Sequence, residues 1–419
     1  MNVTLKDRLK KMSIGEVPQG YVTTSEGIFP NDWKVVQLQE VVRVFRGASP
    51  RPKGDPRYYG GDIPRVLIED VTRDGKYVYP CIDSLTEEGA KKSRLLPKDS
   101  VILSCSGTRV AIPGILGESA CIHDGFFGFD SYDGLLPEYL YYFFLLLHEK
   151  MQSSATKGGV FNNLTTQIMK EMYIQLPSLF EQEKIIDKIK PWDKAIELKE
   201  KLIKQKKEQK KGITQKLLTG EVRLPGFKDK WKKVEFGDVL NLIKKDPIKN
   251  PEDYYLLTVK LHLKGIEGTD KKPNVTTKGR PYYLRESNEL LIGRQNFHNG
   301  GIGIVPENMK NYVASNAISS VGAIKGNLTF YYYYLSNPNF YKKIEHIIGG
   351  TGQKEISEAM MKKLKLFIPV NEDEQTAIKE LLEIIDKEIN LLEEELFQLK
   401  EQKKGLMQLL LTGKVRVKA

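Results

Sequence analysis

The sequence predicts an α+β protein in which two mixed α/β globular domains are separated by two long antiparallel coiled-coil helices, as a pseudo-two-fold internal repeat. Three observations support this prediction. A segment from the middle of the chain recurs at its end, each copy lies within a stretch of coiled-coil periodicity, and a region rich in Gly, Pro and Tyr precedes each stretch. The 419 residues also exceed the size of one ordinary domain.

The repeat is clearest near the ends of the two long stretches. The segment 208–223 (EQKKGITQKLLTGEVR) recurs at 401–416 (EQKKGLMQLLLTGKVR), at an offset of 193 residues. The same offset relates residues further upstream, namely Glu181-Gln182 to Glu374-Gln375 and Asp193-Lys194 to Asp386-Lys387. Trp33 and Trp231 introduce similar short strand patterns. A duplication of this extent predicts one module present twice.

Apolar residues follow the coiled-coil period, in steps of three and four, through both stretches. The expected seam comprises Ile189, Trp192, Ile196 and Ile203 in the first helix and Leu382, Ile385, Ile389, Leu392, Leu396 and Leu399 in the second. Pro191 should interrupt or kink the first helix. A helix of about 38 residues spans roughly 57 Å. Two such helices can pair antiparallel and bury both seams; the alternative is that each seam packs on its own globular region.

The intervening regions have short apolar runs separated by turn signals, which is typical of short strands in mixed α+β domains. We therefore divide the chain into a first globular domain at 1–177, a first long helix at 178–220, a second domain at 221–370, and a second helix with a tail at 371–419. Each domain ends in an aromatic-rich helix, at 138–144 and 329–335. We expect these aromatic side chains to form core rather than base-stacking platforms. Asn337-Pro338 should stop the second of these helices.

Charge and composition narrow the class of protein. The net charge of +11 favours a polyanionic partner such as nucleic acid. The three cysteines are far apart in sequence, which is typical of reduced thiols in a cytoplasmic protein. No uncharged apolar run approaches the length of about 18 residues that spans a membrane, so we expect no membrane association.

Several motifs resemble the specificity subunits of type I restriction–modification systems. They are Leu176-Pro177-Ser178-Leu179-Phe180-Glu181-Gln182-Glu183-Lys184-Ile185, the helix ends at 215–220 and 411–413, Gly60-Gly61-Asp62-Ile63-Pro64 with Glu69-Asp70-Val71, and Ser104-Cys105-Ser106-Gly107-Thr108. The Gly-Gly turns at 157–159 and 349–352 belong to the same set. The resemblance covers essentially the whole chain, but Gly293-Arg294-Gln295-Asn296 departs from the first domain's pattern.

The resemblance implies two target-recognition domains, each reading one half of a bipartite, asymmetric site in double-stranded DNA. The helices would set the spacing and dock two methyltransferase (modification) subunits. Their length corresponds to some 15 base pairs at about 3.4 Å each, enough for two short half-sites and an unread spacer. Restriction/translocase subunits would join through the complex. The chain itself would hold no cofactor, whereas S-adenosylmethionine, ATP and Mg are expected in the partner subunits.

No motif for catalysis is recognisable, so we predict a non-enzyme. Asn337-Pro338-Asn339-Phe340 lacks the second proline of a base-holding loop, and Gly349-Gly350-Thr351-Gly352 lacks the phosphate-loop spacing. With five histidines and no paired Cys/His spacing, we expect no metal site. The alternatives are a DNA methyltransferase/endonuclease fusion and a coiled-coil adaptor that does not bind DNA.

DNA contacts are expected from clustered basic, amide and hydroxyl side chains. In the first domain the candidates are Arg46, Arg51, Lys53, Arg57, Tyr58, Arg73, Lys76, Ser106, Thr108, Arg109, Lys157, Asn162 and Asn163. In the second they are Lys264, Lys271, Lys272, Lys278, Arg280, Arg294, Gln295, Asn296, Lys325, Gln353 and Lys354. For any single residue, a solvated surface charge is an equally good interpretation.

Overall fold

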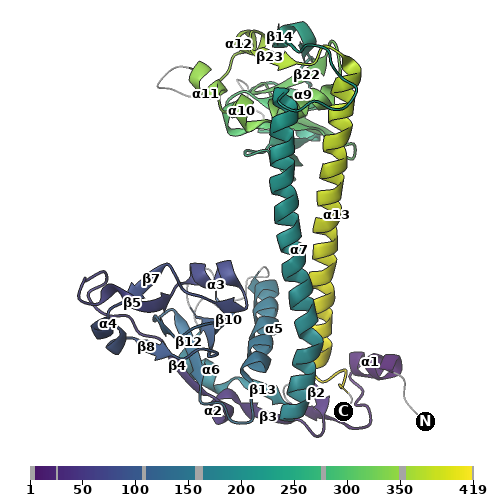
Figure 1. Ribbon diagram of the computed structural model, residues 1–419. Coiled ribbons are helices and arrows are strands. Elements are labelled where there is room, and N and C mark those ends of the chain that lie inside the picture. Colours follow the sequence, from purple (N-terminus) through teal and green to yellow (C-terminus); the bar gives the residue numbers. More distant parts are fainter. Residues whose placement is uncertain are drawn as a thin grey trace. The chain divides into compact units, whose positions relative to one another are not determined.

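The computed structural model describes residues 5–24, 27–105, 110–155, 164–274, 280–348 and 355–417. The chain divides into two compact units, one formed by Met1–Lys199 with Glu395–Ala419 and the other by Glu200–Glu394. Each unit combines one globular domain with a part of both long helices. The course of the chain can be followed by its colour in Figure 1. The end of the chain therefore belongs to the same unit as the first domain.

The two long helices are α7, Leu179–Thr219, and α13, Glu372–Leu411. In the first unit, Lys403 pairs with Asp193, and Lys199 pairs with Glu395. In the second unit, Lys206 pairs with Glu388, and Lys210 pairs with Asp386. Because residue numbers rise on one helix as they fall on the other, the helices run antiparallel in both units, as predicted.

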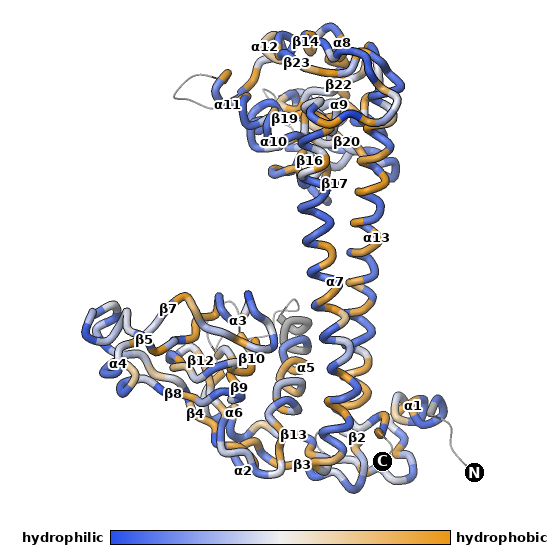
Figure 2. Tube along the Cα trace, in the orientation of Figure 1, coloured by the Kyte–Doolittle hydropathy of each residue, from blue (hydrophilic) through white to orange (hydrophobic). Residues whose placement is uncertain are grey.

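The predicted seam lies on the protected side of both helices. Ile189, Ile203, Leu382 and Ile389 are buried, and the remaining seam residues are half-buried. Figure 2 shows short hydrophobic stretches recurring between hydrophilic ones along α7 and α13. The expected interruption at Pro191 was wrong, because α7 continues through it, whereas the alternative of a kink stays a prediction. Pro191 and Asp187, whose carbonyl loses its usual partner, are both exposed, so water can satisfy that carbonyl.

The first domain is built around two sheets, with strand orders β4-β12-β9-β10-β6 and β7-β5-β11-β8. A hairpin β1-β2 and a pair β13-β3 complete it. The strands are β1 Tyr21–Thr24, β2 Gly27–Pro30, β3 Lys34–Gln37, β4 Arg43–Arg46, β5 Tyr59–Val66, β6 Tyr77–Val78, β7 Asp83–Leu85, β8 Arg94–Leu96, β9 Val101–Ser104, β10 Pro113–Leu116, β11 Ala120–Ile122, β12 Phe126–Asp130 and β13 Tyr173–Leu176. The helices are α1 Leu5–Ser13, α2 Leu38–Val41, α3 Ile68–Asp74, α4 Glu87–Lys91, α5 Pro137–Ala155 and α6 Thr166–Glu171.

The second domain repeats this topology. Sheet β15-β22-β19-β20 matches four strands of the first sheet above, β17-β16-β21-β18 matches the second, and β14-β23 matches β13-β3. The strands are β14 Lys232–Glu235, β15 Leu240–Ile243, β16 Tyr255–Val259, β17 Ile266–Gly268, β18 Tyr282–Arg285, β19 Leu290–Gly293, β20 Ile302–Ile304, β21 Tyr312–Ser315, β22 Ile318–Ala323 and β23 Lys365–Ile368. The helices are α8 Phe236–Val239, η1 Pro251–Asp253, η2 Phe297–Asn299, α9 Leu328–Leu335, α10 Pro338–Tyr341, α11 Ile344–Ile347 and α12 Glu358–Lys362.

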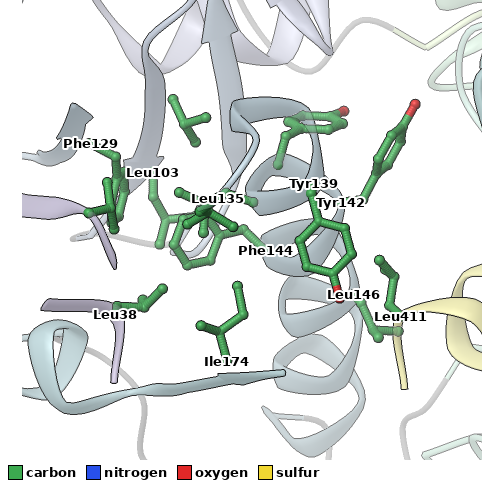
Figure 3. Close-up of a cluster of buried hydrophobic side chains, with 14 of the residues drawn as sticks. Leu38, Leu103, Phe129, Leu135, Tyr139, Tyr142, Phe144, Leu146, Ile174 and Leu411 are labelled. Carbon is green, nitrogen blue, oxygen red and sulfur yellow. The ribbon is translucent and has the colours of Figure 1, made fainter. Parts of the chain in front are cut away.

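The aromatic-rich helices form core, which confirms the prediction. Tyr139, Tyr142 and Phe144 of α5 are at most 1% exposed and pack between the first sheet and the end of α13, where Leu411 closes the cluster (Figure 3). Helix α9 contributes Phe330 and Tyr331 to the equivalent core of the second unit. It ends at Leu335, before Asn337-Pro338, as predicted for a helix stop.

A buried carboxylate joins each domain to the helices of its own unit. In the first unit, the Nε1 of Trp33 donates to Glu181 at the start of α7, which also accepts from Arg416, beyond the end of α13. In the second unit, the Nε1 of Trp231 donates to Glu374, which accepts two hydrogen bonds from Arg223. The first domain is thus held to α7 by an arginine that follows α13, and the second domain is held to α13 by an arginine that follows α7. The recurring helix-end motifs therefore have the same structural role in both copies.

A second recurring contact joins the aromatic-rich helix of each domain to a long helix of its unit. The Tyr142 hydroxyl donates to Asp193, which pairs with Lys403, and the Tyr333 hydroxyl donates to Asp386, which pairs with Lys210. In the first unit, Lys76 adds contacts to Tyr142, Asp193 and Glu138. Burial and the nearby carboxylates raise the pKa of both tyrosines, so each remains a donor at neutral pH.

Candidate nucleic-acid interface

A polar cluster lies at one end of the first sheet, around the turn that precedes β12. The Asp124 carboxylate accepts a hydrogen bond of 2.6 Å from the Ser49 hydroxyl and lies 3.7 Å from the Arg51 guanidinium. Its main-chain carbonyl accepts from the Nε of Arg46, at 2.6 Å. The hydrogen bond from Ser49 holds the pKa of Asp124 below its usual value, so this carboxylate is an acceptor at neutral pH.

Close backbone contact makes this arrangement possible. Gly47 follows β4 and runs beside the His123 carbonyl, where a Cβ would lie 2.2 Å from that oxygen. Only glycine fits there, and the contact places the 47–53 segment against the 123–125 turn. The chain thereby brings three predicted residues, Arg46, Arg51 and Lys53, to one place.

The cluster surrounds a hollow of about 250 Å³. It is lined by Ser49, Arg51, Lys53, Tyr59, Arg65, Leu67, His123 and Asp124. The Arg65 side chain is 7% exposed and is held by Asp83, with 2.7 Å between Nε and the carboxylate. Burial lowers the pKa of His123, whose Nδ1 accepts from the Gly125 amide. The hollow therefore presents fixed donors and acceptors beside exposed arginine and lysine, which is the chemistry needed for base edges and phosphates.

Cys105, the last described residue before the 106–109 gap, contacts the same turn. The Cys105 amide donates to the Gly125 carbonyl, and its thiol lies 3.7 Å from the Asp124 carbonyl. The structure does not describe Ser106, Thr108, Arg109, Lys157, Asn162, Asn163, Lys278, Gln353 or Lys354, which fall outside the described ranges.

The other described candidates of the first domain do not line the hollow and have intramolecular partners. Arg57 pairs with Asp55, and Tyr58 is buried with the Lys92 ammonium over its ring. Arg73 binds Asp70 and Asp74. Lys76 belongs to the Tyr142–Asp193 contact described above, with its side chain 14% exposed. These contacts stabilise the fold, and a DNA role for the four residues stays a prediction.

In the second domain the equivalent sheet end carries different groups. The Arg294 amide donates to the Ala317 carbonyl, as the Cys105 amide donates to that of Gly125. The guanidinium of Arg294 pairs with Glu355 at 2.9 Å and lies 3.8 Å from Glu358. Gln295 lies beside the same Glu355, and the Asn296 side chain is exposed. Arg294, with Glu355 and Glu358 beside it, thus occupies the position that the buried Cys105 occupies in the first domain.

The remaining second-domain candidates are spread over the surface. Lys264, Lys271, Lys272, Arg280 and Lys325 are all exposed. Lys272 lies over the Tyr255 ring at 4.2 Å on the sheet that contains β16, whereas the Lys325 amide donates to Val239, near β15. Arg294, Gln295 and Asn296 therefore follow one another at the end of β19, whereas Lys272 and Lys325 lie beside different sheets.

Sequence reasoning missed Ser49, Arg65, His123 and Asp124 in the first domain and Glu355 in the second. No linear motif joins these residues, because strand pairing between distant segments brings them together. A second surface was also missed: Leu198 of α7 and Leu391 of α13, related by the 193-residue offset, are 53% and 52% exposed on the sides away from the seam.

Among the described residues, no group of three or more His, Cys, Asp and Glu side chains is arranged to hold a metal ion. No helix in the described ranges has the length and apolar character needed to cross a membrane.

Comparison with known proteins gives a consistent result. The model of the type I restriction modification DNA specificity domain matches residues 30–208 and 228–401. The type I restriction enzyme MjaVIII specificity subunit of Methanocaldococcus jannaschii is 24% identical over 410 residues, covering 93% of this chain and 94% of that protein. The MjaIX specificity subunit of the same organism is 31% identical over 186 residues, covering 42% of each chain.

Solved structures share the fold. The S subunit of a type I restriction–modification system from M. genitalium superimposes with a TM-score of 0.54 at 12% identity, covering 92% of this chain and 96% of that one. A chain from a study of assembly and conformational transition of the type I system gives 0.58 at 15% identity, covering 92% and 99%. These identities are low, so the likeness shows the fold alone.

Proposed function

Because the chain belongs to the type I restriction–modification DNA specificity family, we propose that its two domains read separate halves of a bipartite, asymmetric DNA site. The observation that carries this proposal is the contrast between the two copies. The Trp–Glu–Arg contacts with the helices recur, whereas the sheet ends present Ser49, Arg51 and Asp124 in one copy and Arg294 with Glu355 in the other. Two copies that share the same contacts with the helices but differ in the side chains at their sheet ends are expected to bind different DNA sequences.

Chemistry at the first sheet end supports base and phosphate contacts. Arg51, with its side chain 73% exposed, can donate to guanine or grip a phosphate, and the ionised Asp124 can accept from cytosine or adenine amino groups. Buried side chains such as Arg65 are fixed around the hollow, so Arg51 and Asp124 need little rearrangement when DNA binds. We propose that this cluster reads the first half-site.

Profiling of methylation on a randomised-site library, with methyltransferase partners added, tests this. Arg51→Ala should reduce discrimination at one half-site by about 1–3 kcal/mol if Arg51 reads a base, or shrink the salt slope by about one if it grips phosphate. Arg43→Ala is the matched control, because Arg43 is a similarly exposed arginine paired with Asp130 at the other end of β4. Equal effects of both variants, or loss of selectivity at both half-sites, would contradict the assignment.

We further propose that the helices set the half-site spacing and dock two methyltransferase subunits, one on each pseudo-equivalent face. The exposed Leu198 and Leu391 support this, since a repeated apolar position suits two identical partners. Leu198→Glu and Leu391→Glu should each reduce the bound methyltransferase from two copies to one in native mass spectrometry. Retention of two copies by both variants would remove these faces from the interface.

We also propose that the chain is not itself an enzyme and acts in the cytoplasm within a larger complex. S-adenosylmethionine, ATP and Mg would be bound by partner subunits, including restriction/translocase subunits. Incubation of the purified chain with duplex DNA and labelled S-adenosylmethionine should leave the DNA unlabelled and uncut. Methyl transfer by the chain alone would favour the fused-enzyme alternative.

A further inference from the structure

An apolar groove lies on the second unit, beside β23 and the end of α7, with a volume of about 630 Å³. Its walls come from six segments: the end of α7, β14, β23, α12, α11 and the Tyr334–Phe340 region. Three of its apolar residues are strongly exposed, Ile347 at 48%, Met360 at 36% and Phe367 at 47%. Large apolar side chains gathered in one concave place mark an interaction site more often than scattered ones do.

The same groove recurs at the same place in the first unit, with a volume of about 820 Å³. Leu411 and Thr412 line it as Leu218 and Thr219 line the groove of the second unit. The neighbouring strand residues also correspond: Tyr173 and Gln175 on β13 occupy the positions that Lys365 and Phe367 occupy on β23. The groove therefore belongs to the module itself and is not an accident of one surface.

In the first unit, the chain's own N-terminal segment forms part of the groove. Met12 of α1 and Ile28 and Phe29 of β2 line it. Leu9 and Met12 lie one turn apart on α1 and are both half-buried, so a short amphipathic helix presents its apolar side at this place. In the second unit, residues 220–230 precede Trp231 as the N-terminal segment precedes Trp33. None of these residues lines the second groove.

The second groove has a basic rim. Lys233, Lys343, Lys363 and Lys365 line it, and no acidic side chain does. Lys365 pairs with Glu235, and no ion pair involves the other three among the described residues. Helix α1 of a second copy carries Lys6, Arg8, Lys10 and Lys11, so like charges would oppose its binding here.

We propose that the groove of the second unit binds a short amphipathic helix of a partner protein, with its apolar face in the groove and acidic side chains against the lysines. Insertion of an amphipathic helix into an apolar groove is a common mode of peptide recognition. An added strand is disfavoured, because the Phe367 amide on β23 already donates to the Tyr334 hydroxyl. The proposal concerns a protein partner and does not depend on DNA reading.

Fluorescence anisotropy with the full chain and two labelled peptides tests this inference. One peptide is an amphipathic helix of about four turns with leucines on one face and glutamates on the other; the second has lysines in place of the glutamates. The chain should bind the acidic peptide and not the basic one. Met360→Ser with Phe367→Ser should weaken binding by at least about tenfold, which corresponds to about 1.4 kcal/mol. Both side chains are exposed, but the Phe367 ring also packs against Trp231, with ring centroids 5.6 Å apart. The Tm of the double variant is therefore measured beside its peptide binding.

Ile168→Ser provides the matched control, because Ile168 takes the place of Met360 in the groove of the first unit and is 48% exposed. It should leave peptide binding unchanged. Lys343→Glu with Lys363→Glu should reverse the preference toward the basic peptide. Equal binding of both peptides, no binding, or binding insensitive to the serine variants would overturn the proposal. So would an outcome in which the lysine variants lose duplex DNA binding and leave the peptide affinity unchanged.

Discussion

Arg416→Ala, a change three residues from the end of the chain, should destabilise the first domain and leave the second domain intact. Arg416 donates two hydrogen bonds to Glu181 and two to Asp32, at 2.7 to 2.8 Å. Glu181 is buried and would keep only the hydrogen bond from Trp33. The substitution therefore leaves a buried carboxylate without its countercharge.

The magnitude follows from the burial of the two partners. Removing one partner of a fully buried ion pair costs about 3–5 kcal/mol. The Arg416 side chain is 30% exposed and that of Asp32 is 60% exposed, so water screens part of the interaction and the contact with Asp32 adds little. We expect a loss of about 2–3 kcal/mol, or a fall in Tm of roughly 4–12 °C for a unit of this size.

Hydrogen exchange measured by mass spectrometry resolves the two units. In Arg416→Ala, amides of β9 and β12 in the first domain should exchange faster, while β19 and β22 keep their protection. Arg223→Ala is the matched control, since Arg223 has the same role toward Glu374 and should produce the opposite pattern. If Arg416→Ala changes both units equally, or neither, the closure of each domain by the other copy's helix end is refuted.

Three further predictions concern the sheet end and the helix seam. Gly47→Ala should destabilise the first domain by several kcal/mol in urea denaturation, because its Cβ would lie 2.2 Å from a carbonyl oxygen; a stability within about 0.5 kcal/mol of the parent would show that the backbone can shift. Burial lowers the pKa of His123, so the unfolded chain takes up its proton first and stability should fall as pH drops below 6.5. His123→Gln should flatten that slope, and an unchanged slope would exclude His123 as its origin. Leu392→Asp with Leu396→Asp should cost several kcal/mol by placing charges in a half-buried seam, and unchanged Tm would mean that the seam is not protected.

The repeated motifs were accessible from the sequence because they depend on local periodicity and on identity at a fixed offset. The seam residues follow a helical period that is readable in one dimension. Aromatic helices α5 and α9 were correctly expected in the core for the same reason. Pro191 shows where this reasoning fails, because the local rule that proline interrupts a helix does not hold at this position. The proline and the carbonyl that it leaves unpaired are both exposed, so water can replace the lost hydrogen bond.

The sequence by itself determined the family, the duplication, the antiparallel helix pair and the basic character that favours DNA. Tertiary structure decided which side chains share a site. Asp124 lies far from Ser49 in sequence, yet their side chains meet because β4 and β12 pair. Arg416 closes a domain that begins hundreds of residues earlier because the helices run antiparallel. Such contacts depend on long-range pairing, whose free energy is spread over the whole core and leaves no local pattern in the chain.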